Sequence, residues 1–325
     1  MEVGGQCFLL FFNTKMNKEI DLQSIAIRCD AVSKKYGKIE ALKDIHLEVS
    51  KGEIFGIIGP DGAGKTTLFR ILTTLILADK GTAAIDGFDV VTDYKEIRKR
   101  VGYMPGRFSL YQDLTVEENL NFFATVFNTT IEENYELIKD IYIQIEPFKN
   151  RRAGKLSGGM KQKLALSCAL IHKPSVLFLD EPTTGVDPVS RKEFWGMLKK
   201  LKSQGITILV STPYMDEASL CDRIALIQNG EFLKTDTPKN IVKQYKNKLW
   251  SVKSDNMSKL LSDLRNIEPT KICFAFGDSH HVTIFDTEFT MSDLQKMLEK
   301  LAHYDIQIVE IEPTIEDCFM ELSQN

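Results

Sequence analysis

Short apolar runs bounded by turn residues make up most of the first two thirds of the chain. The runs at 25–28, 41–49, 53–58 and 82–86 are rich in β-branched residues, as strands are. Later runs at 101–104, 176–179, 206–211 and 223–228 have the same character, and apolar positions at helical spacing follow several of them. This alternation predicts an α/β fold built on buried parallel strands.

Between the strands at 101–104 and 176–179 the alternation is interrupted by helical patterns. Thr115 and Glu118 form a capping-box pair that predicts a helix from there to about Phe127. A second helix is expected over 131–145, before Pro147, and a third runs to about Ile171. We therefore expect an inserted helical subdomain over about 107–171.

After Pro238 the pattern changes. Strands are predicted at 248–253, 271–276, 282–285 and 306–311, and helices at 255–264, 291–303 and 313–322. The order β-α-β-β-α-β predicts a small ferredoxin-like α+β domain at 247–325. The preceding α/β domain is expected over 25–246. A regulatory or dimerisation role and a purely structural role stay open for the C-terminal domain.

Composition limits the partners and excludes some classes of protein. The 325 residues carry a net charge of −4, which gives no electrostatic basis for binding nucleic acid. Six scattered cysteines without C-x-x-C pairs suit a reducing compartment and argue against disulfides and zinc. No run approaches the roughly 18–20 apolar residues of a membrane span.

Residues 1–24 are expected to be a disordered N-terminal tail. The alternative is that the start codon is placed too early and that the functional chain begins at Met16.

The stretch from Gly59 to Thr67 carries the strongest chemical signal. It fits the phosphate-binding pattern G-x-x-x-x-G-K-[ST], with a strand before it and a helix after it. Its backbone N–H groups, the helix N-terminus and Lys65 are expected to hold the phosphates, and Thr66 to reach Mg²⁺. The nucleotide-binding residues of this loop are predicted to be Gly59, Pro60, Asp61, Gly62, Ala63, Gly64, Lys65, Thr66 and Thr67.

Two carboxylates end the apolar run at 176–179, where α/β sheets hold ligands. Asp180 is expected to hold Mg²⁺ together with Thr66. Glu181 is expected to orient or deprotonate the attacking water. Further along the chain, residues 185–188 are expected to form a turn and the next helix to begin at Arg191.

Before that strand, Ser157 is placed to cap the helix that follows it. Gly158 and Gly159 leave the first N–H groups of this helix open to an anion. In the N-terminal part, Tyr36 precedes a turn glycine, where an aromatic ring either stacks on a purine or is merely half-buried.

Together these motifs resemble the nucleotide-binding subunits of ABC transporters over about 25–243. The resemblance lies in the loop 59–67, Leu-Ser-Gly-Gly-Met-Lys-Gln at 156–162, Asp180-Glu181 and Gly-Val-Asp-Pro at 185–188. The sequence around these motifs is most similar to that of bacterial multidrug or ABC-2-type exporter cassettes. The end of the chain, Pro-Thr-Ile-Glu-Asp-Cys-Phe at 313–319, is similar to the tail of drug-exporter cassettes.

The resemblance implies how the site is assembled. Two cassettes face each other head to tail, and each ATP lies between the loop of one and the Ser-Gly-Gly helix of the other. It implies that Asp187 communicates across the dimer and that Tyr36 stacks on adenine. It also implies membrane subunits as partners, which would attach a cytoplasmic chain to the inner face of the cell membrane. The residues implied to contact nucleotide in trans are Ser157, Gly158, Gly159 and Gln162.

Two positions depart from the family pattern. Gly106 stands where the family has a Gln, and Pro213 stands where it has a His. Neither replacement offers a side-chain donor, and proline also lacks its own N–H. Losing one donor to developing charge costs about 3–4 kcal/mol, or about 10²–10³ in rate. We expect ATP binding with slow hydrolysis at this chain's own site.

This pattern favours a heterodimer. The partner cassette would have the Gln and the His that this chain lacks, and its ATP would be contacted by the intact Ser157–Gln162 segment of this chain. A homodimer that tolerates both replacements is the alternative. Two other classes stay open: a regulatory ATP-binding subunit that never hydrolyses ATP, and a non-transport ABC ATPase of the translation or repair type. The latter usually has two fused cassettes, which this chain lacks.

Overall fold

A computed structural model describes residues 24–286 and 288–324. The prediction of an N-terminal tail therefore falls almost entirely outside the described residues. The chain divides into two compact units. The first contains the described residues up to 54, 64–211 and 229–231, and the second contains 55–63, 212–228 and 232–324. The predicted domain boundary at 246 stays a prediction, and each unit is described separately.

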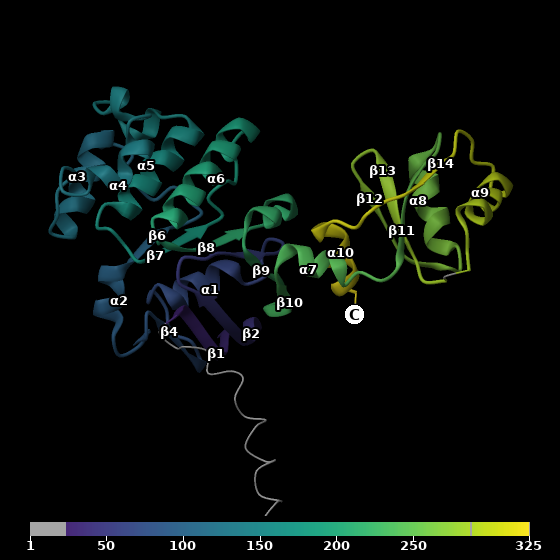
Figure 1. The fold of residues 1–325 in the computed structure, drawn as a ribbon, viewed down its shortest axis with the longest axis horizontal. Helices are drawn as coiled ribbons and strands as arrows, with labels where there is room; N and C mark the ends of the chain where they lie inside the picture. The colour runs from purple at the N-terminus through teal and green to yellow at the C-terminus, as the bar shows by residue number, and fades with distance from the viewer. Residues whose placement is uncertain (1–23, 287, 325) are drawn as a thin grey trace, which may run out of the picture. The chain divides into compact units, whose positions relative to one another are not determined.

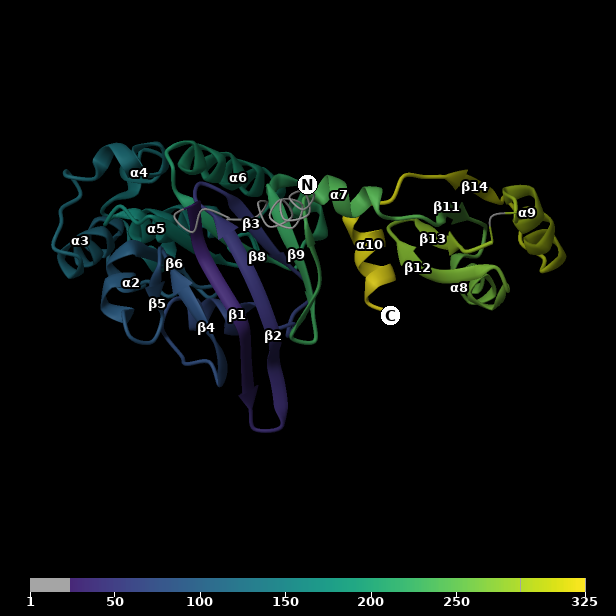
Figure 2. The same ribbon diagram turned by 60° about the horizontal axis from the view of Figure 1, so that its bottom comes forward.

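An antiparallel sheet opens the first unit. Strands β1 (Ile25–Tyr36) and β2 (Ile39–Ser50) form a long hairpin whose turn contains Gly37 at a positive φ of 59° (Figure 2). Strand β4 (Lys80–Ile85) pairs with β1, and the short β5 (Phe88–Asp89) pairs with β4. Buried and more exposed residues alternate along most of β2, which explains why 41–49 is an interrupted rather than a continuous apolar run.

Three parallel strands form the buried part of the first unit. They are β6 (Val101–Met104), β7 (Val176–Asp180) and β8 (Thr207–Thr212), with β7 paired on both sides. Every residue of β7 is buried, as its continuous apolar run predicts. Helix α1 (Lys65–Leu72) contacts this strand through Phe69, whose ring meets that of Phe178 edge to face at 5.9 Å.

The predicted helical subdomain is present. It comprises α3 (Val116–Val126), α4 (Tyr135–Tyr142) and α5 (Gly158–Leu170), which lie together in Figure 1. Thr115 and Glu118 form the expected capping box, whereas α4 is shorter than the predicted 131–145. Helix α2 (Tyr94–Arg100), before β6, was not predicted because only Ile97 is buried along it, so the helical periodicity is weak.

Helix α6 (Pro188–Ser203) begins three residues earlier than predicted. The turn assigned to 185–188 and the start at Arg191 were wrong. Asp187 is the N-cap, and Pro188 occupies the first helical position, where a missing N–H costs nothing. The turn signal therefore marked the start of the helix rather than a separate loop.

In the second unit, β3 (Ile54–Ile58) pairs in parallel with β9 (Arg223–Gln228), and β10 (Glu231–Asp236) lies next to β9. A short 3-10 helix, η4 (Met215–Leu220), follows β8, and α7 (Pro238–Lys243) follows β10. Within residues 24–286 and 288–324, no helix combines the length and apolar composition that crossing a bilayer requires.

The ferredoxin-like prediction for the C-terminal part is confirmed. Strands β11 (Lys248–Lys253), β12 (Thr270–Phe276), β13 (Ser279–Ile284) and β14 (Gln307–Glu310) form an antiparallel sheet in the order β12-β13-β11-β14. Helices α8 (Met257–Asn266) and α9 (Met291–Lys300) share one core with this sheet, and α10 (Ile315–Leu322) follows β14. Trp250, Leu264, Val282 and Leu294 are among the residues of that core.

Candidate functional site

Lys65 is the first residue of α1 and is almost completely buried, with 3% of its surface exposed. Its Nζ lies 3.0 Å from Oε1 of Glu181. Two residues from distant parts of the sequence are therefore brought together as a cation and an anion. A buried lysine keeps its charge only where an anion is within reach, and Glu181 supplies it.

Asp180 ends β7 and is 2% exposed. Ser211 lies opposite it on β8, and its Oγ donates to Oδ1 of Asp180 at 2.6 Å. The N–H of Glu181 in turn donates to the carbonyl oxygen of Ser211 at 3.1 Å and to its Oγ at 3.0 Å. Ser211 thus contacts the carboxylate of Asp180 and the backbone N–H of Glu181. Sequence analysis noted Ser211 only as a strand end, and no local signal identifies it, because its place opposite Asp180 comes from the strand register.

Glu181 has a backbone φ of 49°, in the left-handed region. This conformation is uncommon for a residue with a side chain and is maintained by the hydrogen bonds to Ser211. Its side chain is turned toward Lys65 instead of continuing the direction of the strand. The strain lies at the residue that is predicted to act on water.

The glycines of the loop are required by its geometry. Gly62 and Gly64 have φ values of 79° and 108°, which favour glycine. A Cβ on Gly64 would lie 2.4 Å from the carbonyl oxygen of Ala41, and one on Gly59 would lie 2.1 Å from that of Ile227. Only glycine fits at these two positions.

Gly64 is the N-cap of α1 and provides no side-chain cap, and the first turn of the helix contains no acidic residue. A helix N-terminus of this kind favours an anion through its backbone N–H groups and its dipole. Thr66 and Thr67 are half-buried in the first turn. Within the second unit, Ala63 is buried and its N–H donates to the carbonyl oxygen of Pro60, while Asp61 is exposed.

Gly106 lies against the backbone of Asp180 and Glu181. A Cβ built on it would be 3.0 Å from the carbonyl oxygen of Asp180 and 3.7 Å from Cβ of Glu181. The position that sequence analysis singled out is therefore next to the two acidic residues, and it has no side chain. Residues 64–67, Gly106, Asp180 and Glu181, all in the first unit, are called the Lys65 site below.

Pro213 follows β8 in the second unit, and its neighbours form their own hydrogen bonds. Oγ1 of Thr212 accepts from the N–H of Tyr214 at 3.1 Å and donates to Oε2 of the buried Glu217 at 2.6 Å. The carbonyl oxygen of Thr212 accepts from the N–H of Gly59 at 3.3 Å. Pro213 thus directly follows a residue that contacts the start of the loop.

Ser157, Gly158, Gly159, Gln162 and Asp187, called the Ser157 face below, form a different kind of surface. Oγ of Ser157 accepts from the N–H of Met160 at 3.4 Å and caps α5, as predicted. Ser157 and Gly158 are exposed, and a Cβ on Gly158 would have one neighbour within 4 Å, the carbonyl oxygen of Gly185. Gln162 is half-buried along the same helix. The N-terminus of α5 is open to a second molecule.

Gly159 and Asp187 hold this face together. A Cβ on Gly159 would lie 2.9 Å from Oγ of Ser190, so glycine lets α5 approach the start of α6 closely. Asp187 accepts hydrogen bonds from the N–H groups of Val189 and Ser190 at 3.1 and 3.0 Å. The Ser190 hydrogen bond holds the pKa of Asp187 below its usual range. Its observed role is that of an N-cap.

Tyr36 ends β1 and is 46% exposed. Nζ of Lys34 lies 5.8 Å from the centre of its ring, an arrangement typical of a weak cation–π contact. The ring is available to a ligand, but no described contact brings it to Lys65, so adenine stacking stays a prediction.

Comparison with known proteins agrees with this geometry. Residues 42–184 match the family model "ABC transporter". The chain is 38% identical over 290 residues to the probable multidrug ABC transporter ATP-binding protein YbhF of Escherichia coli (strain K12), covering 87% of this chain and 49% of that protein. It thus spans about half the length of that relative.

A daunorubicin resistance ATP-binding protein, DrrA2 of Streptomyces coeruleorubidus, is 39% identical over 236 residues, which cover 68% of this chain and 70% of DrrA2. Among solved structures, a dimeric post-hydrolysis state of the ATP-binding cassette MJ0796 bound to ADP and Pi is similar with a TM-score of 0.59 at 28% identity. It covers 65% of this chain and 98% of that one. On the strength of these similarities and of the motifs assembled above, the chain belongs to the ATP-binding proteins of the ABC transporter family.

Proposed function

We propose that this chain is the ATP-binding subunit of an ABC exporter, that it binds ATP and Mg²⁺ at the Lys65 site, and that it hydrolyses ATP slowly there. The observation that carries the proposal is the buried Lys65, held 3.0 Å from Glu181 at the start of an uncapped helix. A γ-phosphate is an anion that would compete with Glu181 for this lysine. ATP binding would then release Glu181 toward water.

The loop fits a triphosphate. Its glycines at 62 and 64 have positive φ values, and the buried Lys65 is the first residue of the helix that follows, where the helix dipole favours an anion. Among the described residues no group of three or more His, Cys, Asp or Glu side chains is arranged to hold a metal. Mg²⁺ would therefore be held by few protein groups together with phosphate oxygens, as is usual for this ion in nucleotide sites.

Thr66 and Asp180 are the residues proposed to hold Mg²⁺. One oxygen of Asp180 accepts from Ser211, so its carboxylate is fixed in orientation, while its other oxygen is available to a metal or a metal-bound water. The ion would neutralise charge on the phosphates. Glu181, positioned by Ser211, is proposed to accept the proton of the attacking water.

Slow hydrolysis is proposed because Gly106 and Pro213 offer no side-chain donor. A Cβ built on Gly106 would lie 3.0 Å from the Asp180 backbone carbonyl oxygen, so the position without a side chain is next to the two acidic residues. Each missing donor lowers the rate by about 10²–10³. Binding is expected to persist, because neither position belongs to the loop that holds the phosphates.

A second cassette is proposed to complete the site, and a heterodimer is favoured. The support is the contrast between Gly106 and Pro213, which offer no side-chain donor, and the exposed Ser157 face, which keeps the residues of its motif. The solved cassette MJ0796 is described as dimeric. In a heterodimer, the Ser157 face would serve ATP that is bound to a complete partner.

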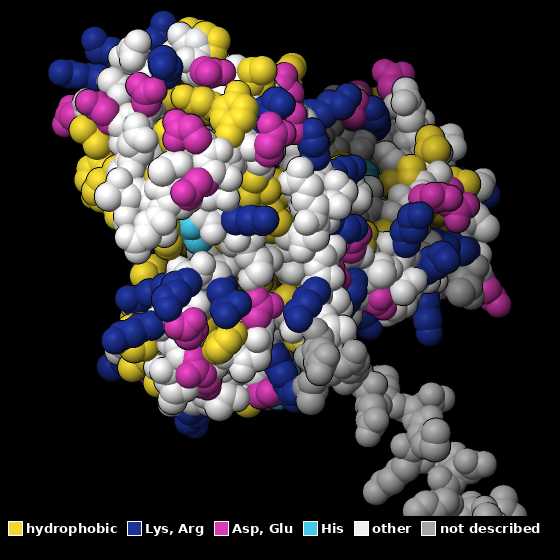
Figure 3. All heavy atoms as spheres, turned by 60° about the vertical axis from the view of Figure 1, so that its left-hand side comes forward, with side chains coloured by type: hydrophobic (Ala, Val, Ile, Leu, Met, Phe, Trp, Pro, Cys, Tyr) yellow, Lys and Arg dark blue, Asp and Glu magenta, His cyan; other side chains and the backbone are white. Residues whose placement is uncertain are grey.

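Membrane subunits are the other proposed partners, attaching the chain to the inner face of the cell membrane. An apolar groove of 510 Å³ supports this part of the proposal. Leu75, Leu110, Phe123 and Val126 line it, together with Met104 two residues before Gly106. Figure 3 shows hydrophobic side chains among charged ones on the face that carries α2–α5. We propose that an apolar segment of a membrane subunit fills this groove.

The proposal is tested by measuring phosphate release from the purified chain alone and from the complex recovered with a tag on this chain in detergent. We expect ATP binding by the chain alone, with phosphate release at least about a hundredfold slower than from the complex. Rapid hydrolysis by the chain alone, abolished by Glu181→Gln, would contradict the slow site. A complex without membrane subunits would favour a non-transport ATPase, and a complex that never hydrolyses ATP would favour a regulatory subunit.

A further inference from the structure

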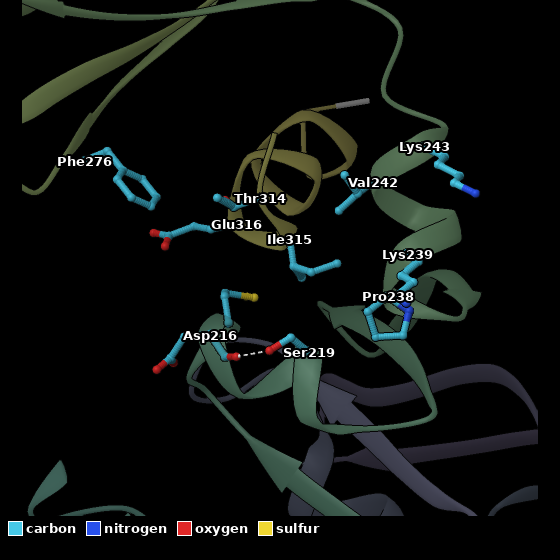
Figure 4. Close-up of a pocket in the computed structure, with 11 residues that line it drawn as sticks. Asp216, Ser219, Pro238, Lys239, Val242, Lys243, Phe276, Thr314, Ile315 and Glu316 are labelled. Atoms are coloured by element: carbon cyan, nitrogen blue, oxygen red, sulfur yellow. Dashed lines mark hydrogen bonds between the residues drawn. The ribbon is translucent and has the colours of Figure 1, made fainter. Parts of the chain in front are cut away.

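A cavity of 630 Å³ lies in the second unit, outside both nucleotide-facing regions (Figure 4). It is enclosed by η4, α7, the start of α10 and the end of β12. Its volume is within the range of pockets that bind drug-sized molecules. Its walls are mainly apolar and are formed by Met215, Pro238, Val242, Phe276 and Ile315.

Charged groups are separated along the rim. In Figure 4, Phe276, Glu316 and Asp216 lie on one side of Ile315, and Lys239 and Lys243 lie on the other. Burial raises the pKa of Glu316, and the charges of Asp317 and Asp216 raise it further, while His281 lowers it. The lysines of α7 are not among the groups that act on Glu316. The end of the cavity at Glu316 and Asp216 is therefore acidic, and the lysines of α7 at the other end do not offset this charge.

The aromatic ring at the acidic end is rigidly placed. Phe276 is stacked on His281 with ring centres 4.1 Å apart and planes 11° apart, and Nδ1 of His281 lies 2.7 Å from the buried Oδ1 of Asp317. A fixed aromatic ring next to two carboxylates attracts a cation through its π face as well as through the opposite charge. This combination also disfavours an anion of the same shape.

The same short helix that lines the cavity also contacts the segment around Pro213. Met215, Asp216 and Ser219 of η4 line the cavity, whereas Glu217 between them is buried and accepts from Oγ1 of Thr212 at 2.6 Å. Thr212 immediately precedes Pro213 and contacts the loop through Gly59. A molecule that moves η4 would therefore shift residues next to the ATP loop.

We propose that this cavity binds a small apolar organic cation, with its apolar body against Ile315 and Val242 and its charge toward Asp216, Glu316 and Phe276, and that the bound cation changes nucleotide turnover through η4. Binding of the cation is independent of the proposed function. The effect on turnover rests on it.

The test compares two ions of the same shape and opposite charge. Tetraphenylphosphonium and tetraphenylborate are titrated into the full chain, and binding is followed by calorimetry and by the thermal unfolding midpoint. We expect saturable binding of the phosphonium and at least tenfold weaker binding of the borate. Equal or tighter binding of the borate would overturn the proposal.

Variants assign the binding to this cavity. Asp216→Asn and Glu316→Gln are each expected to weaken phosphonium binding about 2–5-fold, as partly exposed charge pairs do. Lys239→Gln and Lys243→Gln, the matched controls on the opposite rim, are expected to leave it unchanged or tighter. Val242→Trp fills the cavity and is expected to abolish binding. Unchanged binding in Val242→Trp, or equal losses in the acidic and basic variants, would refute the site.

Binding of a fluorescent ATP analogue is measured in the same samples. It shows that each variant is folded, and it separates the two proposals. Phosphonium binding without ATP binding would leave the cavity site standing and overturn the proposed function. Phosphonium binding that leaves phosphate release from the complex unchanged would overturn the coupling through η4.

Discussion

The Lys65 site and the Ser157 face differ in how their polar groups are paired. At the Lys65 site, Lys65 pairs with Glu181, and Ser211 bonds to the Asp180 carboxylate and to the backbone N–H of Glu181, all within one chain. The Ser157 face exposes a capped helix N-terminus, which a second molecule is proposed to cover. We expect function at the Lys65 site to depend on its charged side chains, and function at the Ser157 face to depend on charge and shape at the proposed interface.

This difference explains how the two regions can diverge. In the proposed function, Gly106 and Pro213 offer no side-chain donor to ATP, while the buried Lys65 keeps its ion pair with Glu181. We therefore expect these replacements to affect turnover more than folding. The Ser157 face is proposed to contact a nucleotide held by another chain, and its preservation is what the proposed heterodimer requires.

The largest effect is expected from Lys65→Ala. It removes the buried charge that a phosphate would contact, so we expect ATP affinity to fall at least about a hundredfold. Titration with a fluorescent ATP analogue in the presence of Mg²⁺ measures this. Lys99→Ala, an exposed lysine paired with Glu96, is the matched control and should bind normally. Affinity within threefold of the unmodified chain would show that Lys65 is not part of the ATP site.

The second effect is a gain of activity. Gly106→Gln combined with Pro213→His supplies the two missing side chains, and we expect phosphate release from the chain alone to rise at least about tenfold. The new Cβ at position 106 requires a shift of a few tenths of an ångström from the Asp180 carbonyl oxygen. Gly106→Ala with Pro213→Ala makes similar backbone changes without the donors. A similar rise in that control would attribute the gain to backbone freedom alone.

Most of the fold was predictable because its signals are local. The run 176–179 is fully buried and therefore continuously apolar, and the C-terminal order β-α-β-β-α-β appears almost residue by residue. Helix α2 was missed because it buries only Ile97. The start of α6 was misplaced because Asp187-Pro188 signals a turn and a helix start equally well.

The candidate site was predictable as a set of residues but not as an arrangement. Motif spacing identified Lys65, Asp180 and Glu181, yet nothing in the spacing predicts that Glu181 pairs with Lys65 or that Ser211 bonds to the Asp180 carboxylate and the Glu181 N–H. Those contacts depend on strand register, which pairs Asp180 with Ser211. The position of Gly106 against Asp180 has the same origin in tertiary structure.

A smaller effect is expected at the Ser157 face. Ser157→Asp keeps an N-cap side chain but brings a negative charge toward the partner's nucleotide. We expect phosphate release from the purified complex to fall about tenfold, because the substitution introduces one unfavourable charge contact of about 1.4 kcal/mol. ATP binding to the isolated chain should be unchanged. Thr115→Ala, which removes the cap of α3 instead, should affect neither measurement. A loss of ATP binding by the isolated Ser157→Asp chain would break the distinction between the two regions.

The smallest effect concerns Asp187 and separates its cap from its proposed communication across the dimer. Asp187→Ala removes the side chain that accepts from Val189 and Ser190, so the unfolding midpoint should fall by about 1–3 °C at neutral pH. Because the hydrogen bond from Ser190 lowers the folded-state pKa of Asp187, the ionised cap stabilises the fold above the ordinary carboxyl range. That stabilisation is lost as pH falls through the lowered pKa, so the difference between Asp187→Ala and the unmodified chain should shrink in acid. Asp187→Asn keeps the cap and should keep the midpoint at neutral pH. If Asp187→Asn nevertheless slows phosphate release from the complex, the charge acts across the interface, and if it does not, Asp187 is only the cap of α6.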